Sequence, residues 1–123
     1  MTCEKNMKPT ILIVEDDTLL EKMYSTKFVS EGFEVWVASD GEMALELLKN
    51  ERKPAFIIMD MMMPKLSGVQ VLEIIRTDPK NGKIPVLILS NLQDPAQIHK
   101  VKELGVIEYL IKANYTPTQI SNF

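Results

Sequence analysis

Asp60 is the residue whose type and position point most directly to chemistry. It ends the apolar run Phe56–Met59 and is followed by Met61–Met63 and Pro64, which stop any regular element. A lone ionised carboxylate in an apolar interior costs several kcal/mol unless it is paired or bound to a metal. The run therefore predicts a buried strand that delivers one acid to the rim of a sheet.

Three further apolar runs also end in polar side chains: Thr10–Val14 before Glu15 and Asp16, Ile84–Leu89 before Ser90, and Val106–Ile111 before Lys112. Carboxylates that meet at one rim repel one another unless a cation joins them. Oxygen ligands without His or Cys nearby suit Mg²⁺, with Mn²⁺ as an alternative. A divalent ion, a lysine and a hydroxyl around one nucleophilic carboxylate would stabilise a transferring phosphoryl group. If these strand ends meet, they predict a site that forms an aspartyl phosphate on Asp60.

The segments between these runs are predicted to be helices, apart from Glu34–Ser39, whose alternation of polar and apolar residues indicates a half-exposed strand. Helix starts are predicted at five capping patterns: Thr18 with Glu21, Ser39 with Glu42, Ser67 with Gln70, Asp94 with Gln97, and Thr116 with Gln119. The apolar residues of the first helix that are expected on one face are Leu19, Leu20, Met23, Tyr24 and Phe28. The second helix is expected to run through Met43, Ala44, Leu47 and Leu48.

Strand–helix alternation predicts an α/β fold with a parallel sheet and helices on both faces. The strands that are apolar throughout belong in the centre of the sheet, and those with polar interruptions suit its edges. These assignments give a doubly wound, five-stranded sheet in the flavodoxin-like order 2-1-3-4-5. In that order Glu15, Asp16 and Asp60 meet at the carboxyl ends of the first and third strands.

Composition narrows the class of protein further. The chain has 123 residues, 46% of them hydrophobic and 25% charged, which is typical of one globular domain. A net charge of −3 argues against direct contact of this domain with nucleic acid or a membrane. The single Cys3 favours a reducing, cytoplasmic setting. Residues 1–8 are predicted to be a loose leader and 9–123 the domain, with a last helix short enough to suggest truncation.

Five segments together resemble the receiver domain of two-component response regulators, chemotaxis regulators among them: Ile13–Asp16, Met59–Pro64, Ser67–Gly68, Leu89–Ser90 and Tyr109–Lys112. The resemblance covers essentially the whole chain. It implies that Asp60 accepts phosphate from a sensor histidine kinase or a phosphotransfer protein. It also implies that Asp16 binds Mg²⁺ directly, that Glu15 acts largely through water, and that the Met62 main-chain carbonyl is a further ligand.

The same resemblance implies a switch. Lys112 would contact the phosphoryl group, Ser90 would move to bond it, and Tyr109 would turn inward behind Ser90. These movements would alter the face made by the helix after Asp94, the strand at 106–111 and the last helix, where an output protein or domain would bind. The domain would then be no enzyme for other substrates, but would catalyse its own phosphorylation and slow dephosphorylation.

Two positions depart from the pattern of this family. A small residue, usually Ala, commonly follows the switch hydroxyl, where this chain has Asn91. Lys112 is commonly followed by proline, where this chain has Ala113. Both departures leave open a phosphate-independent interaction module of the same fold. The short last helix also predicts a homodimer or altered packing on the side of the predicted switch face.

Each of these residue types also has a purely structural role as an alternative. Glu15 and Asp16 could simply cap the first helix, Ser90 could be a loop residue, Lys112 a surface lysine, and Tyr109 a packing residue. Their joint position at strand ends favours the functional reading. A flavodoxin-type electron carrier and a phosphohydrolase are disfavoured. The acids after the first strand would repel a flavin phosphate, and Met62 stands where the second aspartate of such a hydrolase is expected.

Overall fold

The parallel sheet dominates the computed structural model, which describes residues 9–49, 53–63 and 65–121. Its five strands lie in the order β2-β1-β3-β4-β5, and every neighbouring pair is parallel. The strands are β1 Thr10–Val14, β2 Glu34–Ala38, β3 Phe56–Met59, β4 Val86–Ser90 and β5 Glu108–Ile111. The predicted strand order is therefore confirmed.

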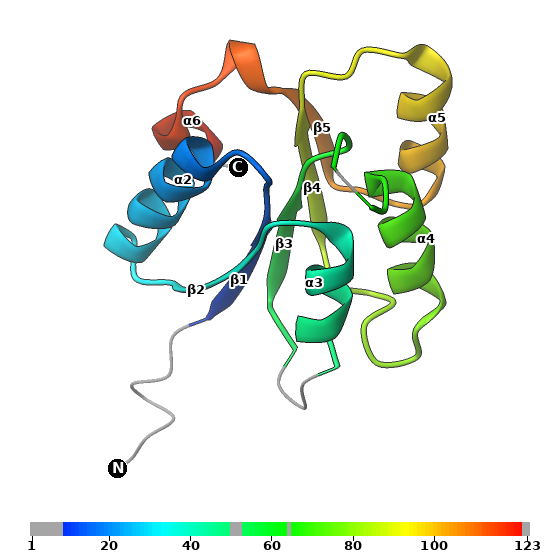
Figure 1. Cartoon of the computed structure of the whole chain (residues 1–123), viewed down its shortest axis with the longest axis horizontal. Helices are drawn as coiled ribbons and strands as arrows, with labels where there is room; N and C mark the ends of the chain where they lie inside the picture. The colour runs from blue at the N-terminus through cyan, green and yellow to red at the C-terminus, as the bar shows by residue number, and fades with distance from the viewer. Residues whose placement is uncertain (1–8, 50–52, 64, 122–123) are drawn as a thin grey trace.

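Helices cover both faces of this sheet, as Figure 1 shows. They are α2 Thr18–Ser30, α3 Gly41–Leu47, α4 Gly68–Thr77, α5 Pro95–Glu103 and α6 Pro117–Ser121, with a 3₁₀ turn, η1, at Lys112–Asn114. The layer of α2 and α6 covers one face and that of α3, α4 and α5 covers the other. Strands β1 and β4 are buried along their whole length, whereas β2 and β5 at the edges are mostly half-exposed.

Each helix start depends on a side-chain cap. Ser67 and Gln70 form the predicted capping box, Thr116 and Gln119 bond reciprocally in the same way, and Asp94 accepts from the Ala96 N–H. Two predicted boxes, Thr18 with Glu21 and Ser39 with Glu42, are wrong.

In both cases an adjacent aspartate is the cap. Asp17 Oδ1 accepts from Leu19 N and Leu20 N at 3.0 and 3.1 Å, and Asp40 Oδ1 accepts from Met43 N at 2.8 Å. A carboxylate is a stronger acceptor than a hydroxyl, and its charge is favourable at the positive end of a helix.

The buried face of α2 is narrower than predicted. Tyr24 and Phe28 are buried and Leu20 is half-buried, so the inner stripe has a four-residue spacing. Leu19 is 68% exposed and Met23 43% exposed, which contradicts the prediction. Each of these two residues precedes a stripe residue by one position, and one residue turns the side chain by about 100° around a helix. Met43 on α3 is likewise exposed, at 44%.

Two strands begin later than predicted. Strand β4 begins at Val86 rather than Ile84, because Pro85 has no N–H to donate to a neighbouring strand. Strand β5 begins at Glu108 rather than Val106.

The predicted leader at 1–8 and the last two residues lie outside the described part of the chain. Within the described residues, no helix combines the length and apolarity needed to cross a bilayer.

Candidate functional site

Strand register brings the predicted site residues to one rim. Val14 pairs with Met59, so the residues that follow them, Glu15 and Asp60, are neighbours where β1 and β3 end. Ser90 pairs with Ile111 at the ends of β4 and β5, which places Lys112 at the same rim. Because parallel strands all end on one side of a sheet, residues far apart in the chain meet here.

Lys112 joins two of the acids directly. Its Nζ lies 2.7 Å from Glu15 Oε1 and 2.7 Å from Asp60 Oδ2. The side chains are 10% exposed for Lys112, 4% for Glu15 and 6% for Asp60. Charged groups this deeply buried are tolerated only when they are paired. The ammonium group therefore neutralises part of the repulsion between the two carboxylates.

The pKa values of Glu15 and Lys112 depend on their burial and on their hydrogen bonds. Burial raises the pKa of the Glu15 carboxyl above its ordinary value, although hydrogen bonds from Lys112 and the Asp17 N–H oppose the rise. Burial lowers the pKa of the Lys112 ammonium, but hydrogen bonds to Asp60 and Glu15 outweigh it and leave the pKa raised. Lys112 is therefore a fixed positive charge beside Asp60.

The loop after Asp60 is held tightly against the start of α4. Asp60 Oδ1 accepts from Met62 N at 3.1 Å, and the Gly68 N–H donates to Met61 O at 2.9 Å. A Cβ at Gly68 would lie 2.7 Å from Met61 Cα and 2.8 Å from Asp60 O, so only glycine permits this approach. The Met62 side chain points outward and is 59% exposed.

Glu15, Asp16 and Asp60 form a group of acids with the composition of a divalent-cation site. One carboxylate oxygen from each lies within 4.8 Å of the others, and Asp16 is exposed while its two neighbours are buried. Three carboxylates and the Lys112 ammonium leave a formal charge of −2 at the rim. Hard oxygen donors with this net charge fit Mg²⁺ or Mn²⁺.

Ser90 and Tyr109 both form hydrogen bonds with Leu92, one with its N–H and the other with its carbonyl. The Ser90 Oγ is fully buried and accepts from Leu92 N at 3.2 Å, and the Tyr109 hydroxyl donates to Leu92 O at 2.7 Å. Burial raises the pKa of the Tyr109 phenol, and the nearby Ser90 side chain opposes the rise.

Tyr24 is a neighbour of the site that the sequence did not reveal. It lies on the inner face of α2 and is 3% exposed. Burial raises the pKa of its phenol, and the charges of Lys112, Glu15 and Asp60 also act on it. The apolar pattern of α2 places Tyr24 inside, but only the packing of α2 across β1 brings it near the rim.

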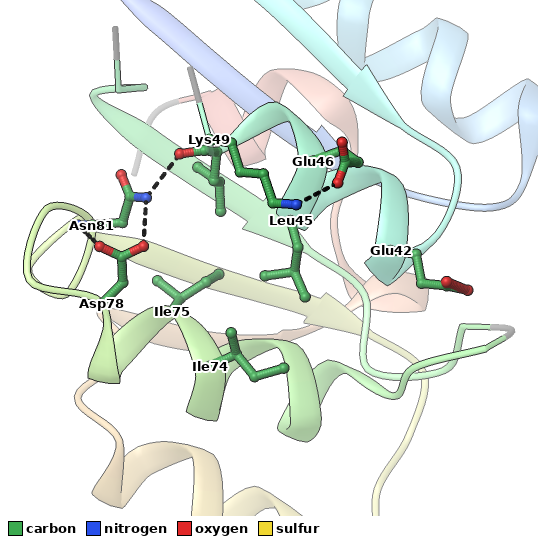
Figure 2. Close-up of a pocket in the computed structure, with 9 residues that line it drawn as sticks. Glu42, Leu45, Glu46, Lys49, Ile74, Ile75, Asp78 and Asn81 are labelled. Carbon is green, nitrogen blue, oxygen red and sulfur yellow. Dashed lines mark hydrogen bonds and ion pairs between the residues drawn. The ribbon is translucent and has the colours of Figure 1, made fainter. Parts of the chain in front are cut away.

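A separate cavity of about 400 Å³ lies between α3 and α4 (Figure 2). Its lining residues are Glu42, Leu45, Glu46, Leu48, Lys49, Ile74, Ile75, Asp78 and Asn81. At one end Asn81 Nδ2 donates to Leu48 O at 3.0 Å and to Asp78 Oδ2 at 3.3 Å. None of the predicted site residues lines this cavity, so it is distinct from the acidic rim.

The fold and the rim together define a class: a doubly wound α/β domain with clustered acids, a lysine and a hydroxyl at the strand ends. The family model for the response regulator receiver domain matches residues 11–121. The chain therefore belongs to the family of response regulator receiver domains. The predicted resemblance is thereby confirmed.

Individual relatives agree with this assignment. A probable transcriptional regulator, ycf27, of Guillardia theta is 37% identical over 113 residues, covering 92% of this chain and 42% of the relative. The chain thus spans less than half the length of that curated relative. The chemotaxis response regulator CheY4 of Vibrio cholerae has a TM-score of 0.84 at 25% identity, covering 94% of this chain and 95% of that one. The Mn²⁺-bound form of response regulator Rcp1 has a TM-score of 0.81 at 25% identity, covering 93% and 88%.

Proposed function

We propose that Asp60 is the phosphoacceptor of this receiver domain. The observation that carries the proposal is the contact of Lys112 Nζ with Asp60 Oδ2 at 2.7 Å, inside a group of three acids at the end of a buried strand. Asp60 is the buried acid that directly follows β3, and its side chain is held from two sides by Lys112 and the Met62 N–H. A fixed carboxylate beside a fixed ammonium suits in-line attack on phosphorus.

The proposed reaction is a displacement at phosphorus. An Asp60 carboxylate oxygen attacks the phosphorus of a phosphohistidine or of acetyl phosphate, and the bond from phosphorus to the donor nitrogen or oxygen breaks. The product is an acyl phosphate on Asp60, and attack by water later returns the carboxylate and inorganic phosphate. Lys112 stabilises the charge on the phosphoryl oxygens, and the domain acts on no other substrate.

A divalent cation is proposed to be held by Glu15, Asp16, Asp60 and the Met62 main-chain carbonyl. Mg²⁺ is the proposed ion and Mn²⁺ the alternative, and the Mn²⁺-bound form of Rcp1 supports a site of this kind in the family. A bound cation would supply charge neutralisation at the phosphoryl oxygens. The exposed Asp16 leaves room for the waters that Mg²⁺ retains.

Phosphorylation is proposed to alter the face made by α5, β5 and α6. Ser90 would leave the Leu92 N–H to bond the phosphoryl group, and the Leu92 carbonyl held by Tyr109 would shift with it. The proposed partners are a sensor histidine kinase or phosphotransfer protein and a downstream output protein or domain. Nucleic acid and membrane are not proposed partners of this domain, which we place in the cytoplasm.

The test is intact-mass spectrometry after incubation with acetyl phosphate and Mg²⁺. Wild-type protein is expected to gain the mass of one phosphoryl group, and Asp60→Asn is expected to gain none. Asn has the same shape and can still accept from the Met62 N–H, so a matched far-UV spectrum verifies that the variant is folded. Equal behaviour of the two proteins would reject Asp60 as the acceptor.

A phosphate-independent interaction module is the second candidate. The observation that favours it is the presence of Asn91 and Ala113 at two positions beside the site. Calorimetry that detects no Mg²⁺ binding, together with no gain of phosphate, would support this candidate.

The proposed homodimer is tested separately by light scattering at high protein concentration, where a monomer would reject it.

A further inference from the structure

Asn91 and Ala113, the two departures from the family pattern, contact each other. Asn91 Oδ1 accepts from the Ala113 N–H at 3.1 Å across 22 residues of sequence. Asn91 directly follows β4, and Ala113 is the second residue of η1, which directly follows β5. The contact therefore joins the loop directly after Ser90 to the turn that begins at Lys112.

The Ala113 N–H needs an acceptor from outside its own turn. The first N–H groups of a helical turn have no partner within it, and Ile111, which precedes η1, provides no side-chain cap. The β4–β5 ladder ends at the pair Ser90 and Ile111. Asn91 thus continues the connection between the two strands beyond the end of the ladder. A proline at position 113 would have no N–H to satisfy.

This contact fixes the backbone on the far side of Lys112. On its near side, Ile111 is held in the ladder by Ser90, and on its far side Ala113 is held by Asn91. The Lys112 side chain then extends inward to reach Glu15 and Asp60 at 2.7 Å each. A lysine side chain has several rotatable bonds, so a fixed backbone on both sides limits where its ammonium group can lie.

The same loop makes two further hydrogen bonds, one with Tyr109 of β5 and one with Ser90 at the end of β4. Leu92 accepts from the Tyr109 hydroxyl through its carbonyl and donates its N–H to Ser90 Oγ. Asn91 lies between Ser90 and Leu92 in the chain, and its side chain adds the connection to η1. The loop after β4 and the residues around Lys112 are therefore held as one unit.

We propose that Asn91 is a positioning residue for Lys112, and that Asn91 and Ala113 form a matched acceptor and donor pair. This inference rests on the proposed phosphorylation of Asp60. Asn91 does not touch the reacting atoms in this role: it acts through the backbone of Ala113. In this chain the hydrogen bond between Asn91 and Ala113 orders the loop after Lys112, where the family commonly has proline.

The experiment compares three variants. Asn91→Ala removes the acceptor, Asn91→Asp keeps an oxygen in the same place, and Gln93→Ala changes an exposed side chain of the same loop as a control. For each protein we would measure amide hydrogen exchange of Ala113 by NMR, the rate of phosphate gain at saturating acetyl phosphate, and the Mg²⁺ affinity by calorimetry.

Asn91→Ala is expected to speed exchange of the Ala113 amide and slow phosphate gain, each by roughly five- to tenfold, the effect of one hydrogen bond. Its Mg²⁺ affinity should stay within about twofold of wild type, because Lys112 is no metal ligand. Asn91→Asp should keep the slow exchange, and Gln93→Ala should match wild type in all three measurements. A merely structural role would leave the phosphorylation rate unchanged.

Two results would overturn the positioning role of Asn91 alone, and a third would overturn the proposed function as well. Unchanged Ala113 exchange in Asn91→Ala would show that the bond does not protect this amide. Faster exchange with an equal or higher phosphorylation rate would show that Asn91 does not position Lys112. Wild-type protein that gains no phosphate would instead overturn the proposed function itself, and the positioning role with it.

Discussion

Three consecutive acids at the end of β1 have different surroundings. Glu15 is buried and bonds Lys112, Asp16 is exposed at the rim, and Asp17 caps α2 with its side chain. Charge alone does not separate these three residues, because all are carboxylates within one turn of chain. Their different contacts predict different consequences when each loses its charge.

Asp16→Asn is expected to weaken Mg²⁺ binding by at least about tenfold, because it removes one charged oxygen ligand from the proposed site. Asp17→Asn is the matched control: it removes the same charge one residue away, and Asn is as good a helix cap as Asp. Calorimetric titration of both variants with Mg²⁺ measures the difference. Equal affinities of the two variants would place the metal elsewhere.

At the scale of elements, Arg76 joins the ends of two helices to the start of β4. Its Nε donates to Leu104 O at 2.7 Å, its Nη1 to Gly82 O and Ile84 O at 3.2 and 2.8 Å, and its Nη2 to Gly105 O at 3.3 Å. These carbonyls lie past the end of α4 and at the end of α5, where backbone acceptors lack helical partners. Burial lowers the pKa of the Arg76 guanidinium, which has no carboxylate in this group of contacts.

Arg76→Lys is expected to lower the free energy of unfolding by about 1–3 kcal/mol, because lysine cannot present a planar fork of donors to several carbonyls. Urea unfolding followed by circular dichroism measures the loss. Lys83→Met, which removes an exposed cation from the adjoining loop, should change the free energy by less than about 0.5 kcal/mol. A loss no larger than that of the control would show that these contacts do not stabilise the native state.

At the scale of the whole molecule, one buried and two half-buried groups predict a loss of stability in alkali. Burial raises the pKa of the Tyr24 and Tyr109 phenols, and carboxylate partners raise that of Lys112 against the effect of burial. A pKa that is higher in the folded state than in the unfolded state favours folding below the unfolded value. That contribution is lost as the pH rises through the folded value. The unfolded values are about 10 for Tyr and 10.4 for Lys, so the loss begins near pH 10.

Tyr24→Phe is therefore expected to make the alkaline loss of stability shallower. Each proton that the folded state keeps and the unfolded state releases contributes a slope of about 1.4 kcal/mol per pH unit, and the variant lacks one such proton. Urea midpoints between pH 7 and about pH 11 measure this slope for both proteins. Identical slopes would show that Tyr24 does not titrate differently in the folded and unfolded states.

Local patterns in the sequence were sufficient to predict much of this fold. A short apolar run that stops at a polar residue identifies a strand and its end, and complete apolarity separates central from edge strands. Asp60, Glu15, Ser90 and Lys112 could be assigned to one rim on this basis, because parallel strands end on the same side. The capping boxes at Thr18 and Ser39 were wrong because a nearby aspartate competes for the same N–H groups.

The sequence by itself determined which residues would reach the rim, since each one ends an apolar run. Only the tertiary structure decided how they pair: Lys112 lies between Glu15 and Asp60, and Ser90 and Tyr109 both contact Leu92. It also decided the contact of Asn91 with Ala113. The physical reason is that these contacts depend on strand register and on the paths of loops, which bring together residues far apart in the chain. Hydrophobic periodicity predicts where a strand or helix lies, but it does not predict register or loop paths.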